Sequence, residues 1–213
     1  MKLVAGLGNP GKQYAETRHN TGFRVVEVLA SRWGFPAGQA QYGSLISMGS
    51  IRQEKVALVR PNTFMNLSGQ PLASISGYYK VDLANLIVVH DDLELPAGVV
   101  RIKQGGGHGG HNGLRSINQQ LGPDYLRVRV GVGRPPEGWD TAAFVLQRLD
   151  AAGLAALDQA VDAAADAVEA ILRDGPIAAM NTLNTRAAAG PVTGGPSAAL
   201  RISTQIRNSP AAL

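Results

Sequence analysis

The 213-residue chain contains no cysteine, which excludes disulfides, thiolate metal sites, iron–sulfur clusters and a cysteine nucleophile. Aromatic residues make up only 5% and charged residues 17%, whereas hydrophobic residues reach 45%, so wholesale disorder is excluded as well. No run of eighteen apolar residues occurs and a patterned strand opens the chain, so we expect neither a membrane span nor a secretory signal. The lack of cysteine fits a cytoplasmic location.

Short β-branched runs alternate with segments of helical periodicity along the first 171 residues. The run at residues 86–89 is continuously apolar, as expected for a central strand covered on both faces. This alternation predicts an α/β fold with a single domain, a three-layer sandwich around a mixed, mostly parallel twisted sheet. The predicted strands cover residues 2–7, 42–51, 56–59, 86–90, 99–103 and 126–132, and the predicted helices cover residues 23–33, 72–79, 114–121 and 154–171.

The strand and helix patterns stop near Arg186. The remaining segment is rich in Ala, Gly and Pro and offers too few large apolar residues to build a core. We therefore predict a folded domain at residues 1–185 and a mobile tail at residues 186–213.

Basic residues are concentrated in one part of the chain. Residues 1–149 hold 16 Lys and Arg against 10 Asp and Glu, a net charge of +6, whereas residues 150–174 hold six acids against one Arg. The division indicates a basic body that faces a polyanion such as a nucleic acid. A solvated basic face is the alternative interpretation.

A glycine-rich segment at residues 6–11 matches the G-x-G-x-x-G dinucleotide fingerprint. That fingerprint requires a helix directly after the loop, so that free backbone N–H groups meet the pyrophosphate. Here Pro10 removes one N–H group, and helical spacing resumes only near Phe23. A nicotinamide-dependent enzyme is therefore a minor alternative, and we expect no cofactor.

Polar side chains gather where the predicted strands end. Asn9 follows the first strand, Asn62 and Asn66 follow another, and Asp91 and Asp92 end the apolar central strand. The carboxyl ends of strands form the ligand crevice in open α/β sheets. Each Asn alone reads as a turn residue, but their convergence on one edge of the sheet favours a functional site.

Three histidines, His19, His108 and His111, lie in polar or Gly-rich surroundings rather than on apolar faces. A histidine can take a proton from water, and a carboxylate partner fixes its tautomer and stabilises the imidazolium. Asp91 ends a buried strand and is the best-placed residue for that role. No tight ligand spacing supports a metal site, so we predict none.

Two strands beyond the crevice carry alternating basic residues. Arg101 and Lys103 alternate with aliphatic residues on one strand, and Arg127 and Arg129 do so on the other. The period of two places each pair on one face of its strand. The pairs fit either a phosphate-binding strip beside the crevice or a solvated outer face.

Five sequence blocks occur in the order found in a known family. They closely resemble the signatures of bacterial-type peptidyl-tRNA hydrolases, and the resemblance spans roughly residues 1–185. The blocks are residues 6–11 (GLGNPG) with 17–23 (TRHNTGF), residues 61–69 (PNTFMNLSG), residues 90–93 (HDDL), residues 105–114 (GGGHGGHNGL), and residues 127–131 (RVRVG) with 133–135 (GRP).

The resemblance implies an enzyme that cleaves, without a metal, the ester between a peptide and the 3′ ribose of tRNA. It implies that His19 is the general base that activates water and that Asp91 holds and polarises His19. Asn9 and Asn66 would position the peptide and the scissile carbonyl. Tyr14 and Met65 would line the site, and Asn112 would orient substrate or water. His111 would belong to a mobile loop at the crevice mouth. Lys103 and Arg129 would hold a tRNA phosphate.

The implied partner is tRNA, and the resemblance leads us to expect a cytoplasmic monomer. A non-catalytic RNA-binding protein is the alternative, because plastid splicing cofactors arose from this family on the same fold. The basic strands would serve RNA binding equally well. A pure binder, however, has no need of a base at the crevice.

Overall fold

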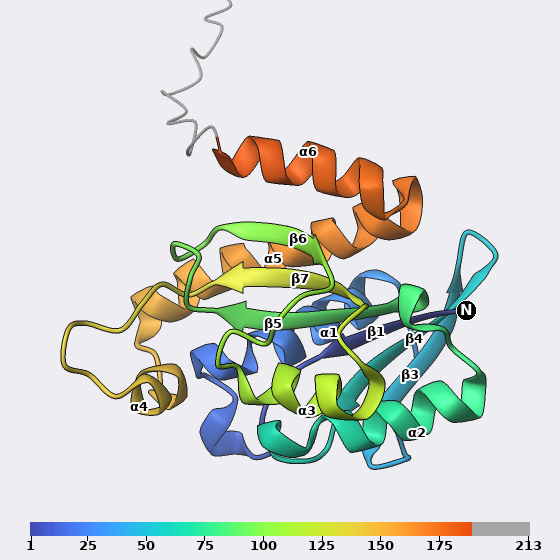
Figure 1. Cartoon of the computed structure of the whole chain (residues 1–213), viewed down its shortest axis with the longest axis horizontal. Coiled ribbons are helices and arrows are strands. Elements are labelled where there is room, and N and C mark those ends of the chain that lie inside the picture. Colours follow the sequence, from blue (N-terminus) through green and yellow to red (C-terminus); the bar gives the residue numbers. More distant parts are fainter. Residues whose placement is uncertain (189–213) are drawn as a thin grey trace, which may run out of the picture.

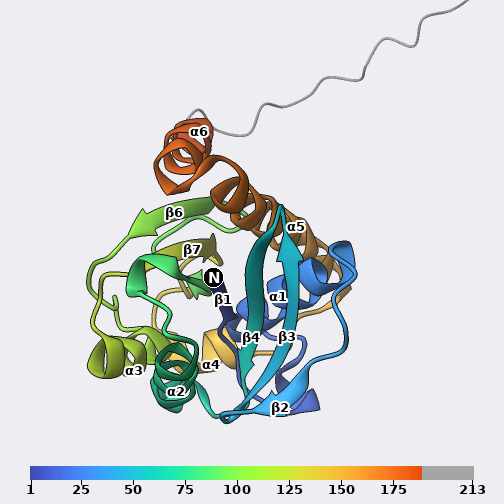
Figure 2. The same ribbon diagram turned by 90° about the vertical axis from the view of Figure 1, so that its right-hand side faces the viewer.

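In the computed structural model, which describes residues 1–188, a seven-stranded sheet is covered by helices on both faces (Figures 1 and 2). This arrangement confirms the predicted α/β sandwich. The strands are β1 (Lys2–Gly6), β2 (Gln39–Gln41), β3 (Ser44–Ile51), β4 (Glu54–Pro61), β5 (Leu86–Asp92), β6 (Val100–Gln104) and β7 (Leu126–Gly131).

The strand order is β2-β3-β4-β1-β5-β7-β6. The central strands β4, β1, β5 and β7 run parallel, whereas β3 pairs antiparallel with β4 and β6 pairs antiparallel with β7. The carboxyl ends of the four central strands therefore meet at one edge of the sheet, where such folds bind their ligands.

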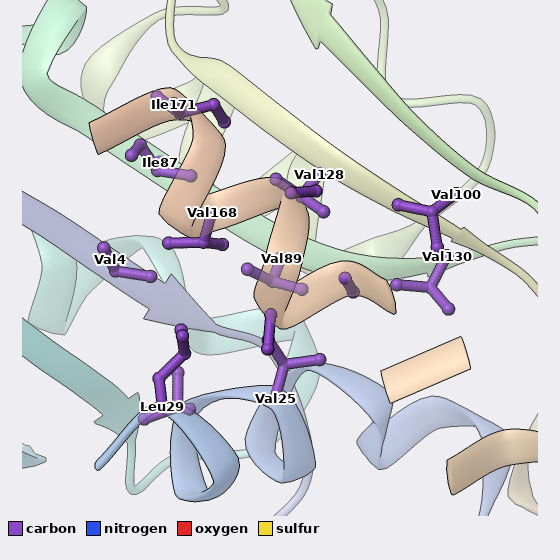
Figure 3. Close-up of a cluster of buried hydrophobic side chains, with 14 of the residues drawn as sticks. Val4, Val25, Leu29, Ile87, Val89, Val100, Val128, Val130, Val168 and Ile171 are labelled. Atoms are coloured by element: carbon purple, nitrogen blue, oxygen red, sulfur yellow. The ribbon is translucent and has the colours of Figure 1, made fainter. Parts of the chain in front are cut away.

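Helices α1 and α5 cover one face of the sheet, and α2 and α3 cover the other (Figure 2). Figure 3 shows the first of these two cores, in which Leu29 of α1 and Val168 of α5 close over Val4 and Val89 of the central strands. The helices are α1 (Thr21–Arg32), α2 (Gly69–Tyr79), α3 (Asn112–Leu121), α4 (Thr141–Leu146), α5 (Ala151–Asp174) and α6 (Pro176–Ala188).

Helix α1 approaches the sheet so closely that only glycine fits at the contact. A Cβ atom on Gly6 would lie 2.0 Å from the carbonyl oxygen of Gly22, and one on Gly22 would lie 2.3 Å from the amide nitrogen of Leu7. The first glycine of the G-x-G-x-x-G segment thus serves helix–strand packing. The contact seats the start of α1 over the carboxyl end of β5, because a Cβ on Gly22 would also meet the carbonyl oxygen of Val89.

Two helices, α4 and α6, were not predicted from the sequence. Helix α6 lies beside the edge strand β6 (Figure 1) and continues to Ala188, past the predicted domain end at residue 185. Residues 189–213 of the predicted tail lie outside the described part of the chain. Among the described helices, none combines the length and the apolar character that crossing a lipid bilayer requires.

Candidate active site

A cleft of about 1010 Å³ lies at the carboxyl ends of the central strands. All of the predicted site residues line this cleft, so the structure brings together positions that are up to 120 residues apart in the sequence. These residues are Asn9, Tyr14, His19, Met65, Asn66, Asp91, Lys103, His111, Asn112 and Arg129.

His19 and Asp91 form a hydrogen-bonded pair at the floor of the cleft. Nδ1 of His19 lies 3.0 Å from both carboxylate oxygens of Asp91, whose side chain is 3% exposed. Burial alone would lower the pKa of His19, but the charge and the hydrogen bond of Asp91 outweigh burial and raise it above the usual 6.5. Because the bond to Asp91 occupies Nδ1–H, Nε2 is left as the proton acceptor.

Burial by itself would raise the pKa of Asp91. The attraction of His19 and His111, and the hydrogen bonds from both rings, instead hold this pKa far below its ordinary range. Asp91 is therefore an ionised carboxylate throughout the neutral pH range, as an orienting group for a general base must be.

His111 caps helix α3 at the end of the glycine-rich segment, and the mobility expected of that segment stays a prediction. Its Nδ1 accepts hydrogen bonds from the backbone N–H groups of Gly113 and Leu114, at 3.1 and 3.3 Å, at the start of α3. The proton of this ring consequently lies on Nε2, which donates to Asp91 Oδ1 at 3.1 Å. Both histidine rings thus donate to the same carboxylate.

The same three side chains place ligand-type atoms within 4.8 Å of one another, a spacing that could hold a metal ion. A metal would need the lone pair of His111 Nε2, but that nitrogen carries the proton because Nδ1 faces two amide donors. The three side chains thus form a hydrogen-bonded cluster in which His111 Nε2 has no lone pair to offer a metal ion.

Asn9 is locked in place beside this pair. Its backbone N–H donates to Asn20 Oδ1 and its carbonyl accepts from Asn20 Nδ2, both at 2.9 Å. Its side-chain Oδ1 accepts from the backbone N–H of Met65 at 2.8 Å. The amide group of Asn9 is thereby oriented, and its Nδ2 donors remain available to a substrate oxygen in the cleft.

Two further asparagines lie on the cleft walls. Asn66 lies in the short 3₁₀ turn Met65–Leu67, and Asn112 is the first residue of α3. Both are exposed and both line the cleft, so their amides can reach a bound substrate. Met65 is 4% exposed and is packed into the core below them.

The basic strip on β6 and β7 divides into two parts with different surroundings. Arg127 is only 2% exposed, and its guanidinium donates to the carbonyl oxygens of Gly106 and Gly107, the latter at 2.6 Å. The phosphate-binding expectation for Arg127 is therefore replaced by a structural role that anchors the glycine loop. Lys103 and Arg129, the two residues predicted to hold a phosphate, both line the cleft.

Three contacts that support the site were not predicted from the sequence, although Asp92 and Arg127 were named there among the polar and basic residues near the crevice. Asn20 fixes Asn9, Arg127 fixes the glycine loop, and Asp92 holds Arg129. Helix α4 adds an apolar wall through Val145 and Leu146. These contacts join separate segments of the chain, so no local sequence pattern predicts them.

A carboxylate-oriented histidine, convergent amides and a flanking cationic strip in one cleft are the features expected of a hydrolase that acts on a polyanionic substrate. The protein-family model described as "Peptidyl-tRNA hydrolase" matches residues 3–190 of the chain. The chain therefore belongs to the peptidyl-tRNA hydrolase family.

Individual relatives agree with this assignment. The chain is 52% identical over 182 residues to the peptidyl-tRNA hydrolase of Rubrobacter xylanophilus, covering 85% of this chain and 99% of the relative. It is 48% identical over 184 residues to that of Rhodococcus opacus, covering 85% and 97%. The crystal structure of peptidyl-tRNA hydrolase from Acinetobacter baumannii superimposes with a TM-score of 0.81 at 38% identity, covering 86% of this chain and 94% of that one.

Proposed function

We propose that the protein, which acts on peptidyl-tRNA and releases tRNA, does so through water activated by His19 in the cleft described above. The observation that carries this proposal is the 3.0 Å pairing of His19 Nδ1 with a buried Asp91. This pairing leaves Nε2 as the base and supports the resulting imidazolium. General-base help of this kind supplies roughly 10²- to 10⁴-fold in rate.

In the proposed reaction, Nε2 of His19 takes a proton from water while the water oxygen bonds to the ester carbonyl carbon. The side-chain amide of Asn9, aimed by Asn20 and Met65, donates to the oxyanion that develops; such a donor adds roughly 10²- to 10³-fold. Collapse of the tetrahedral intermediate breaks the ester C–O bond. The His19 imidazolium then returns the proton to the departing ribose oxygen.

The remaining predicted roles extend this proposal. Asn66 positions the peptide and the scissile carbonyl together with Asn9, and Asn112 orients substrate or water. Tyr14 and Met65 line the site. Lys103 and Arg129 form the phosphate clamp, the name used below for these two residues, and hold a phosphate of the tRNA. The donor pattern around His111 supports catalysis without a metal, and the family resemblance alone leads us to propose a cytoplasmic monomer.

The experiment is hydrolysis of an N-blocked aminoacyl-tRNA by the purified full chain, with and without a chelator. His19→Ala should lower kcat by roughly 10²-fold or more, because the base is lost, while tRNA binding persists. His108→Ala is the matched control, since it removes another cleft histidine that has no role in the proposed step; its kcat should change little.

Two outcomes would count against the proposal. Near-normal turnover by His19→Ala would remove His19 from the mechanism. Binding of tRNA by the wild-type protein without any hydrolysis would favour the non-catalytic RNA-binding alternative instead.

A further inference from the structure

Asp92 directly follows the catalytic carboxylate on β5 and contacts the phosphate clamp. Its Oδ2 accepts a hydrogen bond from Nε of Arg129 at 2.7 Å, and its Oδ1 accepts from the backbone N–H of Glu94 at 2.9 Å. Both carboxylate oxygens are thus engaged, and the side chain is only 13% exposed. The carboxylate is therefore fixed from two sides.

The contact determines which edge of Arg129 a ligand can reach. Nε is occupied by Asp92, whereas neither Nη atom has a hydrogen-bond partner among residues 1–188. Arg129 is 22% exposed and lines the cleft together with Lys103. A planar guanidinium held at Nε presents its Nη edge in one fixed orientation to a phosphate in the cleft.

Asp92 also changes the charge of the clamp. Two cations beside an open cleft attract any RNA, because every nucleotide carries a phosphate. A carboxylate within hydrogen-bond distance of one of them offsets much of that attraction. A phosphate that engages both Lys103 and the Nη edge of Arg129 gains two charge-assisted contacts against this one opposing charge.

Burial would by itself raise the pKa of Asp92, but hydrogen bonds from Arg129 and from the Glu94 amide outweigh burial and lower it. The carboxylate is consequently charged at the pH at which RNA would be bound.

We propose that Asp92 is a specificity-determining positioning residue that orients Arg129 and weakens the attraction of the phosphate clamp for RNA that is not correctly placed. This inference rests on the proposed role of Lys103 and Arg129. Asp92 acts on the substrate through Arg129.

The test compares Asp92→Asn with Glu94→Gln. An asparagine keeps an oxygen for the Glu94 amide but turns an N–H group toward Arg129 Nε, so the contact with Arg129 is lost. Glu94 lies two residues further along the chain and pairs with Arg134. Its replacement by Gln removes the same charge as Asp92→Asn but leaves the contact of Arg129 intact. The probe is a single-stranded oligouridylate that carries no acyl group.

Asp92→Asn should bind the oligouridylate about tenfold more tightly at low salt, because one opposing charge near the clamp is removed. The slope of log Kd against log salt should steepen by about 0.7, the value for one additional phosphate contact on a single strand. The kcat/KM for N-blocked aminoacyl-tRNA should not rise by the same factor as the affinity for oligouridylate. The ratio of kcat/KM to the association constant for oligouridylate therefore falls. Glu94→Gln should change oligouridylate binding less than twofold.

A double-mutant cycle shows whether Asp92 acts through Arg129. Arg129→Gln should abolish the effect of Asp92→Asn on oligouridylate binding and on its salt slope. Arg129→Lys is the second variant if Asp92→Asn folds poorly, since it keeps the charge and loses the Nε contact; it should retain oligouridylate binding while kcat/KM falls.

Equal effects of Asp92→Asn and Glu94→Gln on oligouridylate binding would show that the change in binding depends only on net charge, and would overturn the inference. An undiminished effect of Asp92→Asn in the Arg129→Gln background would also overturn it. Loss of hydrolysis in the wild-type protein would instead refute the proposed function, so the two failures are distinguishable.

Discussion

At the scale of single residues, the site depends on hydrogen bonds that aim other polar groups. His111 caps α3 with one ring nitrogen and donates to Asp91 with the other, so its tautomer is set by the helix. Asn20 satisfies both backbone groups of Asn9 in the same way that a paired strand would. A sequence reveals the residue types at these positions but not which groups they engage.

We predict that Asn20→Ala lowers kcat by about tenfold and the free energy of unfolding by about 1–3 kcal/mol, because it leaves the buried N–H and C=O of Asn9 unpaired. Steady-state kinetics and urea unfolding measure the two effects. Asn118→Ala is the control, since Asn118 accepts a hydrogen bond from Tyr125 away from the catalytic pair; it should lose stability and keep kcat. Equal loss of kcat in both variants would show that Asn20 acts only through general stability.

At the scale of elements, the hydrophobic periodicity was sufficient to locate the main strands and helices. The apolar run at residues 86–89 lies in the central strand β5, and the longest amphipathic pattern is α5. Helix α6 was missed because its fit to the fold depends on a contact with an edge strand rather than on a strong apolar stripe. Likewise, Tyr42 was expected in a strand but lies in the turn before β3. Its φ of 50° is a left-handed backbone conformation that a tyrosine does not predict.

Helix α6 covers the edge strand β6, and one of its side chains bonds to the strand backbone. Asn184 accepts from the backbone N–H of Ile102 at 3.0 Å and donates to the carbonyl of the same residue at 2.9 Å. These bonds replace the neighbour that an edge strand lacks. The contact supports counting α6 as part of the folded domain, whereas the predicted boundary at residue 185 stays a prediction.

Asn184→Ala should lower the free energy of unfolding by about 1–3 kcal/mol and speed hydrogen exchange of the Ile102 amide, because both edge hydrogen bonds are lost. Urea unfolding and amide exchange measured by NMR provide the readouts. Asn181→Ala removes an exposed Asn from the same helix and should change neither quantity appreciably. Unchanged exchange at Ile102 in Asn184→Ala would contradict the role of α6 as an edge cover.

At the scale of the whole molecule, the fold class and part of the cleft lining could be predicted from the strand pattern and the strand ends, whereas Tyr14 and Met65 were predicted only from the family resemblance. Parallel strands bring their carboxyl ends to one edge, so Asn9, Asn66 and Asp91 had to converge once the sheet was predicted. The division of the basic strip could not be predicted, since Arg127 and Arg129 occupy equivalent positions of one alternation. Only packing shows that Arg127 is buried against the glycine loop whereas Arg129 faces the cleft.

The acidic residues of helix α5 form ion pairs within the fold. Its acids pair with Arg24 and Arg32 of α1 on the face of the sheet opposite α2 and α3. Those arginines are consequently compensated locally. Lys103 and Arg129, by contrast, line the cleft.

The central claim is that His19 is a base whose pKa Asp91 raises, and the pH dependence of kcat/KM tests it most directly. Because the base must be neutral, the wild-type rate should increase with pH and level off above a pKa higher than 6.5. Asp91→Asn removes the charge that raises this pKa, so its profile should level off at lower pH, with a plateau roughly 10²-fold lower or more because the tautomer is no longer fixed. A profile that keeps its midpoint and its plateau in Asp91→Asn would contradict the account.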